Sequence, residues 1–145
     1  MIKQNLMEND NICRLSKNDE GEHMIEKIIT TFEEDERQYI FDVICENFNQ
    51  LATHKQGLCV MKKLIEYTKN KNSQTIIVTK ILEDPLCYVQ NEFGNFVVSE
   101  VLQRFDYTTN KQIFDKMKGN FVKLSQNKYS SKFIEICIEK APVDV

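Results

Sequence analysis

Histidine and cysteine are the residue types with which this 145-residue chain could ligate a metal ion or carry out nucleophilic chemistry. The chain has two histidines, at positions 23 and 54, and five cysteines, at positions 13, 45, 59, 87 and 137. Because no Cys-x-x-Cys pair occurs and the number of cysteines is odd, neither a zinc cluster nor a disulfide framework fits these spacings. We expect the thiols to be small buried hydrophobic groups in a reducing compartment.

His23 stands between Glu22 and Glu26, an arrangement that could bind a metal ion or support acid–base catalysis. One His and two Glu on one exposed turn are a weak pattern for either chemistry, so we expect no metal site. His54 precedes a predicted helix, where a lone loop histidine is typically solvated. The sequence contains no phosphate-binding Gly loop, no Gly-x-Ser-x-Gly elbow and no His-Glu-x-x-His. We therefore expect a protein that is not an enzyme and needs no cofactor.

The elements that would position these side chains follow a repeat of 36 to 37 residues. Four successive repeats align on a small residue, here called the anchor, which is Gly21, Gly57, Gly94 or Ser130. The residues three, four, seven and eight positions after each anchor are apolar. This spacing traces one face of a helix and predicts an amphipathic central helix that begins near each anchor.

A second set of apolar positions predicts a closing helix in each repeat. Apolar pairs recur 37 residues apart at Tyr39-Ile40, Ile76-Ile77 and Ile113-Phe114. The neighbourhoods of Ser73 and of Thr108-Thr109 are expected to supply the N-cap residues. Each repeat then holds a short, a central and a closing helix, none of which can bury its apolar face alone. The predicted fold is all-α, a solenoid of about four stacked repeats with one continuous core.

Composition agrees with a folded helical chain. Hydrophobic residues make up 41% of the sequence, and Gly 4 and Pro 2 are low counts for a turn-rich sandwich or barrel. No stretch approaches the roughly 18 consecutive apolar residues of a membrane span. We expect a cytoplasmic protein without a membrane partner, with the nucleus or nucleolus as alternative locations.

The net charge of −3 is unfavourable for a nucleic-acid binder, because phosphate neutralisation normally supplies most of the affinity. The charge is unevenly distributed. Residues 1–45 hold five Lys and Arg against eleven Asp and Glu, whereas residues 46–145 hold fourteen against eleven. The objection therefore applies to the first repeat and not to the mildly basic remainder.

The beginnings of the central helices resemble Pumilio-family (PUF) repeats. The resemblance is carried by Phe93-Gly94-Asn95-Phe96-Val97-Val98 and by residues 124–135, and residues 51–61 and 21–25 look like more divergent versions. It covers nearly the whole chain from about residue 9, and the repeats look like the fourth to seventh of the usual eight. It implies a right-handed, armadillo-like solenoid of three-helix repeats. The implied organisation is an N-terminal extension at 1–8 and a partial repeat domain at 9–145, with repeats at about 9–45, 46–82, 83–118 and 119–145, the last incomplete.

The resemblance also implies a role for each residue near the anchor. In such proteins the central helices line a concave face, and each repeat reads one unstacked RNA base with two or three side chains. The residues one and five positions after the anchor bracket a base edge, and the residue two positions after it stacks on the base. The base-edge pairs are Glu22/Glu26, Leu58/Lys62, Asn95/Ser99 and Ser131/Glu135, and the stacking residues are His23, Cys59, Phe96 and Lys132.

The last two repeats resemble base-reading repeats most closely. Ser131 with Glu135 resembles the guanine-reading combination, since a carboxylate can accept from the two donors on the Watson–Crick edge of guanine. Asn95 and Phe96 match the uracil-reading pattern, with Ser99 in place of the usual Gln. If the strand runs antiparallel to the repeats, as in the family, guanine is followed by uracil.

The first two repeats depart from the family pattern. Leu58 neither donates nor accepts hydrogen bonds, so we expect Lys62, Lys63 and Cys59 to contribute RNA backbone contact or weak base contact. Glu22 and Glu26 place two carboxylates around one base site and would repel phosphate. The first repeat is therefore expected to read RNA poorly, with His23 as its stacking residue.

Two functions are open at this point. The resemblance implies sequence-selective binding of single-stranded RNA with a UGU-like sequence in mRNA 3′ untranslated regions, and control of mRNA stability or translation. Protein partners would bind the convex face or the open C-terminal end, where residues 141–145 stop at the start of the expected fourth closing helix; no small-molecule substrate is expected. The alternative is a helical-repeat scaffold for protein interactions that has lost RNA readout, as Glu22/Glu26 and Leu58/Cys59 suggest.

Overall fold

The computed structural model describes residues 14–140, apart from the side chains of Lys132, Cys137 and Lys140. This span is helical and contains no strand, which confirms the predicted all-α fold. Among its helices, none is both long and apolar enough to span a membrane. The chain divides into two compact units, Met1–Asn70 and Lys71–Val145, so the division falls inside the second predicted repeat.

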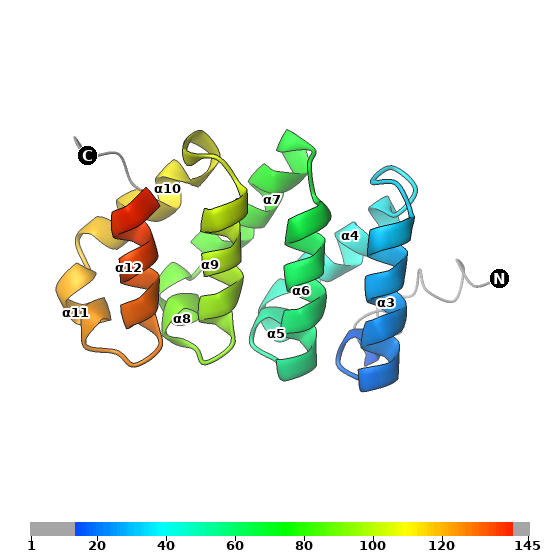
Figure 1. Ribbon diagram of the computed structural model, residues 1–145, viewed down its shortest axis with the longest axis horizontal. Helices are drawn as coiled ribbons and strands as arrows, with labels where there is room; N and C mark the ends of the chain where they lie inside the picture. Colours follow the sequence, from blue (N-terminus) through cyan, green and yellow to red (C-terminus); the bar gives the residue numbers. More distant parts are fainter. Residues whose placement is uncertain (1–13, 141–145) are drawn as a thin grey trace. The chain divides into compact units, whose positions relative to one another are not determined.

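The first unit contains the central helices of the first two repeats, which lie side by side (Figure 1). Its helices are α3 (Asp19–Thr31), α4 (Gln38–Glu46), α5 (Phe48–Ala52) and α6 (Lys55–Tyr67). The central helices are α3 and α6, α4 closes the first repeat, and α5 is the short helix of the second repeat, packed against α6. The packing of α3 on α6 brings the first two predicted reading positions together.

The second unit repeats this arrangement. Its helices are α7 (Lys71–Leu82), α8 (Pro85–Gln90), α9 (Gly94–Arg104), α10 (Tyr107–Lys118), α11 (Phe121–Ser125) and α12 (Ser130–Lys140). The central helices α9 and α12 pack together, as do the closing helices α7 and α10, and the short helices α8 and α11 pack on α9 and α12 (Figure 1). The predicted order of short, central and closing helices is therefore confirmed.

The apolar stripes of the central helices form the core of each unit. Four positions after the anchor, Ile25, Met61, Val98 and Ile134 are all buried. Two residues of the predicted apolar stripe, Met24 and Ile138, are exposed, although their counterparts in the middle repeats are buried. Both belong to terminal repeats of the described part of the chain, where only residues 14–16 are helical before α3 and no helix follows α12. Burial of the stripe thus depends on a neighbouring repeat.

The closing helices bury the second residue of each predicted apolar pair. These residues are Ile40, Ile77 and Phe114. The first residue of the pair varies in its environment: Ile113 is fully buried, whereas Ile76 is 42% exposed. Only the second residue of the pair is therefore buried in all three closing helices.

The anchor is small because the short helix of the same repeat passes against it. A Cβ atom on Gly57 would lie 2.8 Å from the Cα atom of Leu51, in α5, and an equally close approach occurs at Gly21. The fourth anchor, Ser130, has a side chain, and its Oγ donates a 2.5 Å hydrogen bond to the carbonyl of Leu124 in the short helix. In each case the partner lies six residues ahead of the anchor. This contact fixes the short helix against the start of the central helix.

A side chain three residues ahead of the anchor accepts hydrogen bonds from the backbone at the start of each central helix. In the first repeat, Asn18 Oδ1 accepts hydrogen bonds from the backbone N–H groups of Glu20 and Gly21. The equivalent acceptors in the later repeats are His54 Nδ1, Asn91 Oδ1 and Asn127 Oδ1. Such caps satisfy backbone donors that the helix itself leaves without a partner.

The structure corrects the expectation for His54 and specifies the helix starts expected near Ser73 and Thr108-Thr109. His54 is not a solvated loop residue, because its Nδ1 atom lies 3.2 Å from the Gln56 nitrogen and caps α6. Ser73 lies inside α7 and not at its start. The N-cap of α10 is Asp106, whose carboxylate accepts from the Thr109 N–H at 2.8 Å. The pKa of this carboxyl is lowered to about 2 by hydrogen bonds from Lys71 and Thr109.

Substitution of His54 tests the cap directly. His54→Ala is expected to lower the free energy of unfolding by about 1 kcal/mol, because two backbone N–H groups lose their acceptor. His54→Asn should retain the stability of the unmodified chain, since asparagine performs this role in the other three repeats. Urea denaturation followed by circular dichroism measures both. Equal stability of the two variants would contradict the capping role.

A buried arginine holds the far ends of α3 and α6. The guanidinium of Arg37 donates to the carbonyl of Phe32, at the end of α3, and to that of Tyr67, at the end of α6, the latter at 2.7 Å. Asn110 lies sixteen positions after its anchor, as Arg37 does. It donates to the carbonyls of Val101 and Phe105. Carbonyls at helix ends lack a helical partner. Arg37 satisfies two of them and thereby fixes the end of α3 against the end of α6.

Candidate nucleic-acid interface

The second unit presents an exposed aromatic ring beside two polar side chains. Phe96 on α9 is 47% exposed, while the two residues that follow it, Val97 and Val98, are buried in the core. Ser131 and Glu135 are exposed on α12, the helix that packs against α9. Phe96, Ser131 and Glu135 are therefore available to a ligand on neighbouring helices, as an aromatic platform and a hydroxyl–carboxylate pair.

The hydroxyl of Ser131 is oriented by the backbone. Its Oγ donates to the carbonyl of Lys128 at 3.2 Å, so the lone pairs of Oγ remain as acceptors. The stacking position next to it, Lys132, has a side chain that lies outside the described residues. Its predicted stacking role stays a prediction.

Asn95 is more constrained than the sequence suggests. Its side chain is buried, and its Nδ2 atom donates to the carbonyls of Asn91 and Glu92, at 2.8 and 3.0 Å. Its partner across one turn, Ser99, is half-buried. The amide nitrogen of Asn95 is thus occupied in the loop before α9, which leaves the carbonyl oxygen as the other hydrogen-bonding atom of this side chain. An acceptor at this point suits the N3–H donor of uracil.

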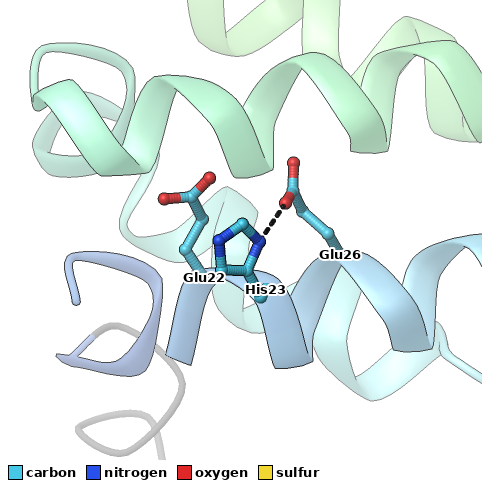
Figure 2. A group of neighbouring side chains, drawn as sticks. All are labelled: Glu22, His23 and Glu26. Carbon is cyan, nitrogen blue, oxygen red and sulfur yellow. Dashed lines mark ion pairs between the residues drawn. The ribbon is translucent and has the colours of Figure 1, made fainter. Parts of the chain in front are cut away.

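In the first unit, Glu22, His23 and Glu26 form a close cluster on α3. Their potential ligand atoms all lie within 4.8 Å of one another, and His23 Nδ1 is 3.6 Å from Glu26 Oε2. Figure 2 shows the imidazole between the two carboxylates, with both carboxylates extending to the same side of the helix. The His23 side chain is 78% exposed, whereas Glu22 is only 9% exposed. The predicted stacking residue is accessible, but its neighbour is held within the protein.

The electrostatics of this cluster are unfavourable for a second anion. Burial raises the pKa of Glu26, and the nearby charge of Glu22 raises it further, against the opposing effects of His23 and Lys63. The pKa of the Cys59 thiol, on α6, is raised by partial desolvation of this exposed residue, by the Glu22 charge and by a hydrogen bond to Glu22. The thiol is therefore held protonated and is a poor nucleophile. These shifts agree with the expectation that the first repeat disfavours phosphate.

The remaining predicted residues of the second repeat lie on α6. Lys62 is exposed, whereas Lys63 is half-buried with its Nζ 3.8 Å from Glu66 Oε1, and Leu58 is half-buried. Lys62 is the side chain better placed for a phosphate. The expectation of buried thiols is wrong for Cys59 and Cys87, which are exposed, and correct for Cys45.

Two features of this surface were not predicted from the sequence. The cap residues Asn18, His54, Asn91 and Asn127 share one offset from the anchor, so alignment of the repeats alone could have identified them. The contact between Glu22 and Cys59 joins two repeats and has no signal in the sequence.

Comparison with known proteins identifies the family. The Pumilio-family RNA binding repeat matches residues 11–45, 47–82 and 120–144 of this chain. The chain belongs to the Pumilio family. The third repeat, with Asn95 and Phe96, lies outside the matched segments. Membership of a family of binding repeats supports the expectation that the chain is not an enzyme.

Pumilio proteins of yeasts and plants resemble most of this chain. Pumilio domain-containing protein C6G9.14 of Schizosaccharomyces pombe is 31% identical over 135 residues, which are 93% of this chain and 20% of that protein. Pumilio homolog 12 of Arabidopsis thaliana is 28% identical over 90% of this chain and 22% of its own length. The chain thus spans about a fifth of the length of these relatives.

Solved Pumilio-family structures share the fold. The Puf4 RNA binding domain, bound to a 3′ UTR recognition sequence of HO endonuclease RNA, has a TM-score of 0.88 at 18% identity, over 94% of this chain and 42% of that chain. The RNA-binding domain of yeast Puf5p, bound to SMX2 RNA, has a TM-score of 0.82 at 27% identity, over 91% of this chain and 37% of that chain. The helices of this chain therefore follow the arrangement of Pumilio RNA-binding domains, which are helical solenoids.

Proposed function

We propose that this chain binds single-stranded RNA through α9 and α12 and reads a guanine–uracil step. The observation that carries the proposal is the exposure of Phe96, Ser131 and Glu135 on two helices that pack together. A large aromatic side chain held in solvent beside a hydroxyl and a carboxylate suits a ligand with both a flat apolar face and hydrogen-bond donors. An unstacked nucleobase has both properties.

Each residue has a definite chemical role in this proposal. The Glu135 carboxylate accepts from the N1–H and N2–H donors of guanine, and Ser131 adds a hydroxyl at the same edge. Phe96 offers a ring face for stacking, and the Asn95 carbonyl oxygen accepts from uracil, with Ser99 one turn away. In the second repeat, Lys62 contacts the RNA backbone. Guanine recognition is the most selective of these contacts, because an ionised acceptor distinguishes donors from acceptors strongly.

The affinity of the chain alone is expected to be weak. Base stacking contributes about 1–3 kcal/mol per base, so two or three bases give about 2–9 kcal/mol before the cost of ordering the RNA. A dissociation constant of about 1 μM requires about 8 kcal/mol. We therefore expect binding at micromolar concentrations or above.

The role of such binding is proposed to be post-transcriptional control in the cytoplasm. The Puf4 domain that shares this fold is bound to a 3′ UTR recognition sequence. By the same chemistry, this chain would bind UGU-like elements in mRNA 3′ untranslated regions and alter mRNA stability or translation. Protein partners would then bind the surfaces that RNA leaves free.

Glu135→Gln tests guanine readout. The variant should lose about tenfold in its preference for an RNA that contains UGU over the matched UCU RNA, because a neutral amide presents one acceptor where the carboxylate presents two. Fluorescence polarisation at low salt measures both affinities. Glu139→Gln, on the same helix and also exposed, is the control for the loss of one negative charge. Unchanged discrimination by the Glu135 variant would contradict the assignment.

A second function is favoured by the first unit. The paired carboxylates of Glu22 and Glu26 and the half-buried Leu58 suit a protein-interaction scaffold that has lost RNA readout. The two functions differ in a simple measurement: a scaffold binds UGU and UCU RNA equally poorly before any substitution. That result would favour the scaffold and reject the RNA proposal.

A further inference from the structure

The first and last central helices of the described part of the chain each carry an exposed apolar face. The α3 end face consists of Met24, Ile28 and Phe32, and the α12 end face consists of Ile138 together with Val122 of α11. We propose that the α3 end face of one copy of this chain binds the α12 end face of a second copy, so that copies associate head to tail. The inference does not rest on RNA binding.

The α3 end face is the surface that a preceding repeat covers on α6. Met24 and Phe32 are 39% and 44% exposed, at three and eleven positions after their anchor. The equivalent residues of α6, Val60 and Thr68, are buried. Because α3 precedes α6 and packs against it, these offsets mark the side of a central helix that the preceding repeat covers. On α3 the same side is open to solvent.

The α12 end face is the surface that a following repeat covers on α9. Ile138 is 69% exposed, whereas its equivalent Leu102 is buried on α9, against which α12 packs. Val122 in the short helix α11 is exposed, whereas Leu86, at the same place in α8, is half-buried, and α8 contacts α12. The two end faces are therefore opposite sides of one kind of repeat.

The contacts within each unit show how two such faces meet. In the pairs α3 with α6 and α9 with α12, the following side of one repeat packs on the preceding side of the next. A second copy with its α12 end face on the α3 end face would form the same contact between chains. Stacked repeats are stabilised by such nearest-neighbour contacts. Each chain offers one face of each kind, so the association is heterologous.

The segments that carry the two end faces have opposite charge. Residues 19–36, which include α3 and the loop after it, hold eight Asp and Glu against one Lys. Residues 111–140, which include α11 and α12, hold seven Lys against three Asp and Glu. Among the described side chains, the exposed Lys116 and Lys123 make no ion pair. Unlike ends therefore attract and like ends repel, which favours a second copy bound head to tail.

Analytical ultracentrifugation of the full chain without RNA tests the proposal. The weight-average mass should rise above the 17.1 kDa of one chain as the protein concentration increases. Met24→Glu and Ile138→Glu should each abolish this rise, because each places a charge in an apolar contact. The matched control is Ile76→Glu on the closing helix α7, where the isoleucine is as exposed as Met24, and it should associate like the unmodified chain. Circular dichroism melting confirms that each variant is folded.

A mixture of the two end-face variants distinguishes head-to-tail association from other arrangements. The Met24 variant keeps its α12 end face and the Ile138 variant keeps its α3 end face. An equimolar mixture should therefore form a complex of one chain of each variant and nothing larger. A mixture that stays monomeric would contradict the head-to-tail arrangement.

Three further results would overturn the proposal. The unmodified chain could keep the mass of a single chain at every concentration, as when another part of the same chain covers these faces. Association could survive Ile138→Glu, as when two α3 end faces pair with each other, or survive Met24→Glu. The Ile76 control could lose association to the same extent as the end-face variants. Because no RNA is present, each of these results leaves the RNA proposal unaffected.

Discussion

Gly57→Ala is expected to lower the free energy of unfolding of the first unit by about 3 kcal/mol. The added Cβ would lie 2.8 Å from the Cα atom and 3.0 Å from the carbonyl carbon of Leu51. These are backbone atoms, so α5 must move as a whole or separate from α6, and no rotation of a side chain relieves the contact. Urea denaturation followed by circular dichroism measures the loss.

Gly119→Ala is the matched control for this substitution. No heavy atom lies within 4 Å of the position that a Cβ on Gly119 would occupy, and its φ of −78° suits any L residue. The change should alter stability by less than about 1 kcal/mol in either direction. If the Gly57 and Gly119 variants unfold at the same urea concentration, the close approach at the anchor does not govern packing of the short helices.

Phe96→Ala is expected to weaken binding of a UGU-containing RNA by about 5-fold to 100-fold, because stacking on an aromatic ring contributes about 1–3 kcal/mol per base. The ring is 47% exposed and lies beside buried core residues, so its removal should leave the fold intact. Fluorescence polarisation gives the affinity, and Phe96→Tyr should retain it.

Ile76→Ala controls for the loss of an exposed apolar side chain. Ile76 lies on the closing helix α7 of the same unit and is 42% exposed, close to the value for Phe96. It should leave RNA affinity unchanged, because closing helices carry none of the predicted reading positions. Equal losses in the Phe96 and Ile76 variants would mean that the ring acts through stability and not through stacking.

The sequence predicts the helices well because their signals are periodic and local. The anchors Gly21, Gly57, Gly94 and Ser130 correctly mark the starts of four central helices, and the apolar offsets correctly mark the core. Prediction fails at Met24 and Ile138, because burial there requires a neighbouring repeat, which an intrahelical pattern cannot supply.

The site residues are harder to predict because their environment comes from other segments. Asn95 lies at the start of a helix, where its side chain can turn back to the carbonyls of the loop that precedes it. The burial of Glu22 depends on α6, which is a different repeat. The opposite holds for His54, whose capping role depends only on the local chain. It stands three residues before its anchor, as asparagine does in the other repeats. The match is hard to see in the sequence because the acceptor is an imidazole nitrogen and not an amide oxygen.

The caps and the anchor contact have a consequence for how the repeats change over time. They place the residue two positions after each of the first three anchors at the surface without giving it a part in the core, and this residue is an imidazole in His23, a thiol in Cys59 and a phenyl ring in Phe96. Since the fold imposes no requirement on this position, natural selection acts there only through what the side chain binds. Each repeat can therefore gain or lose a ligand independently of its neighbours, and adjacent repeats of one chain can diverge in function while their helices stay the same.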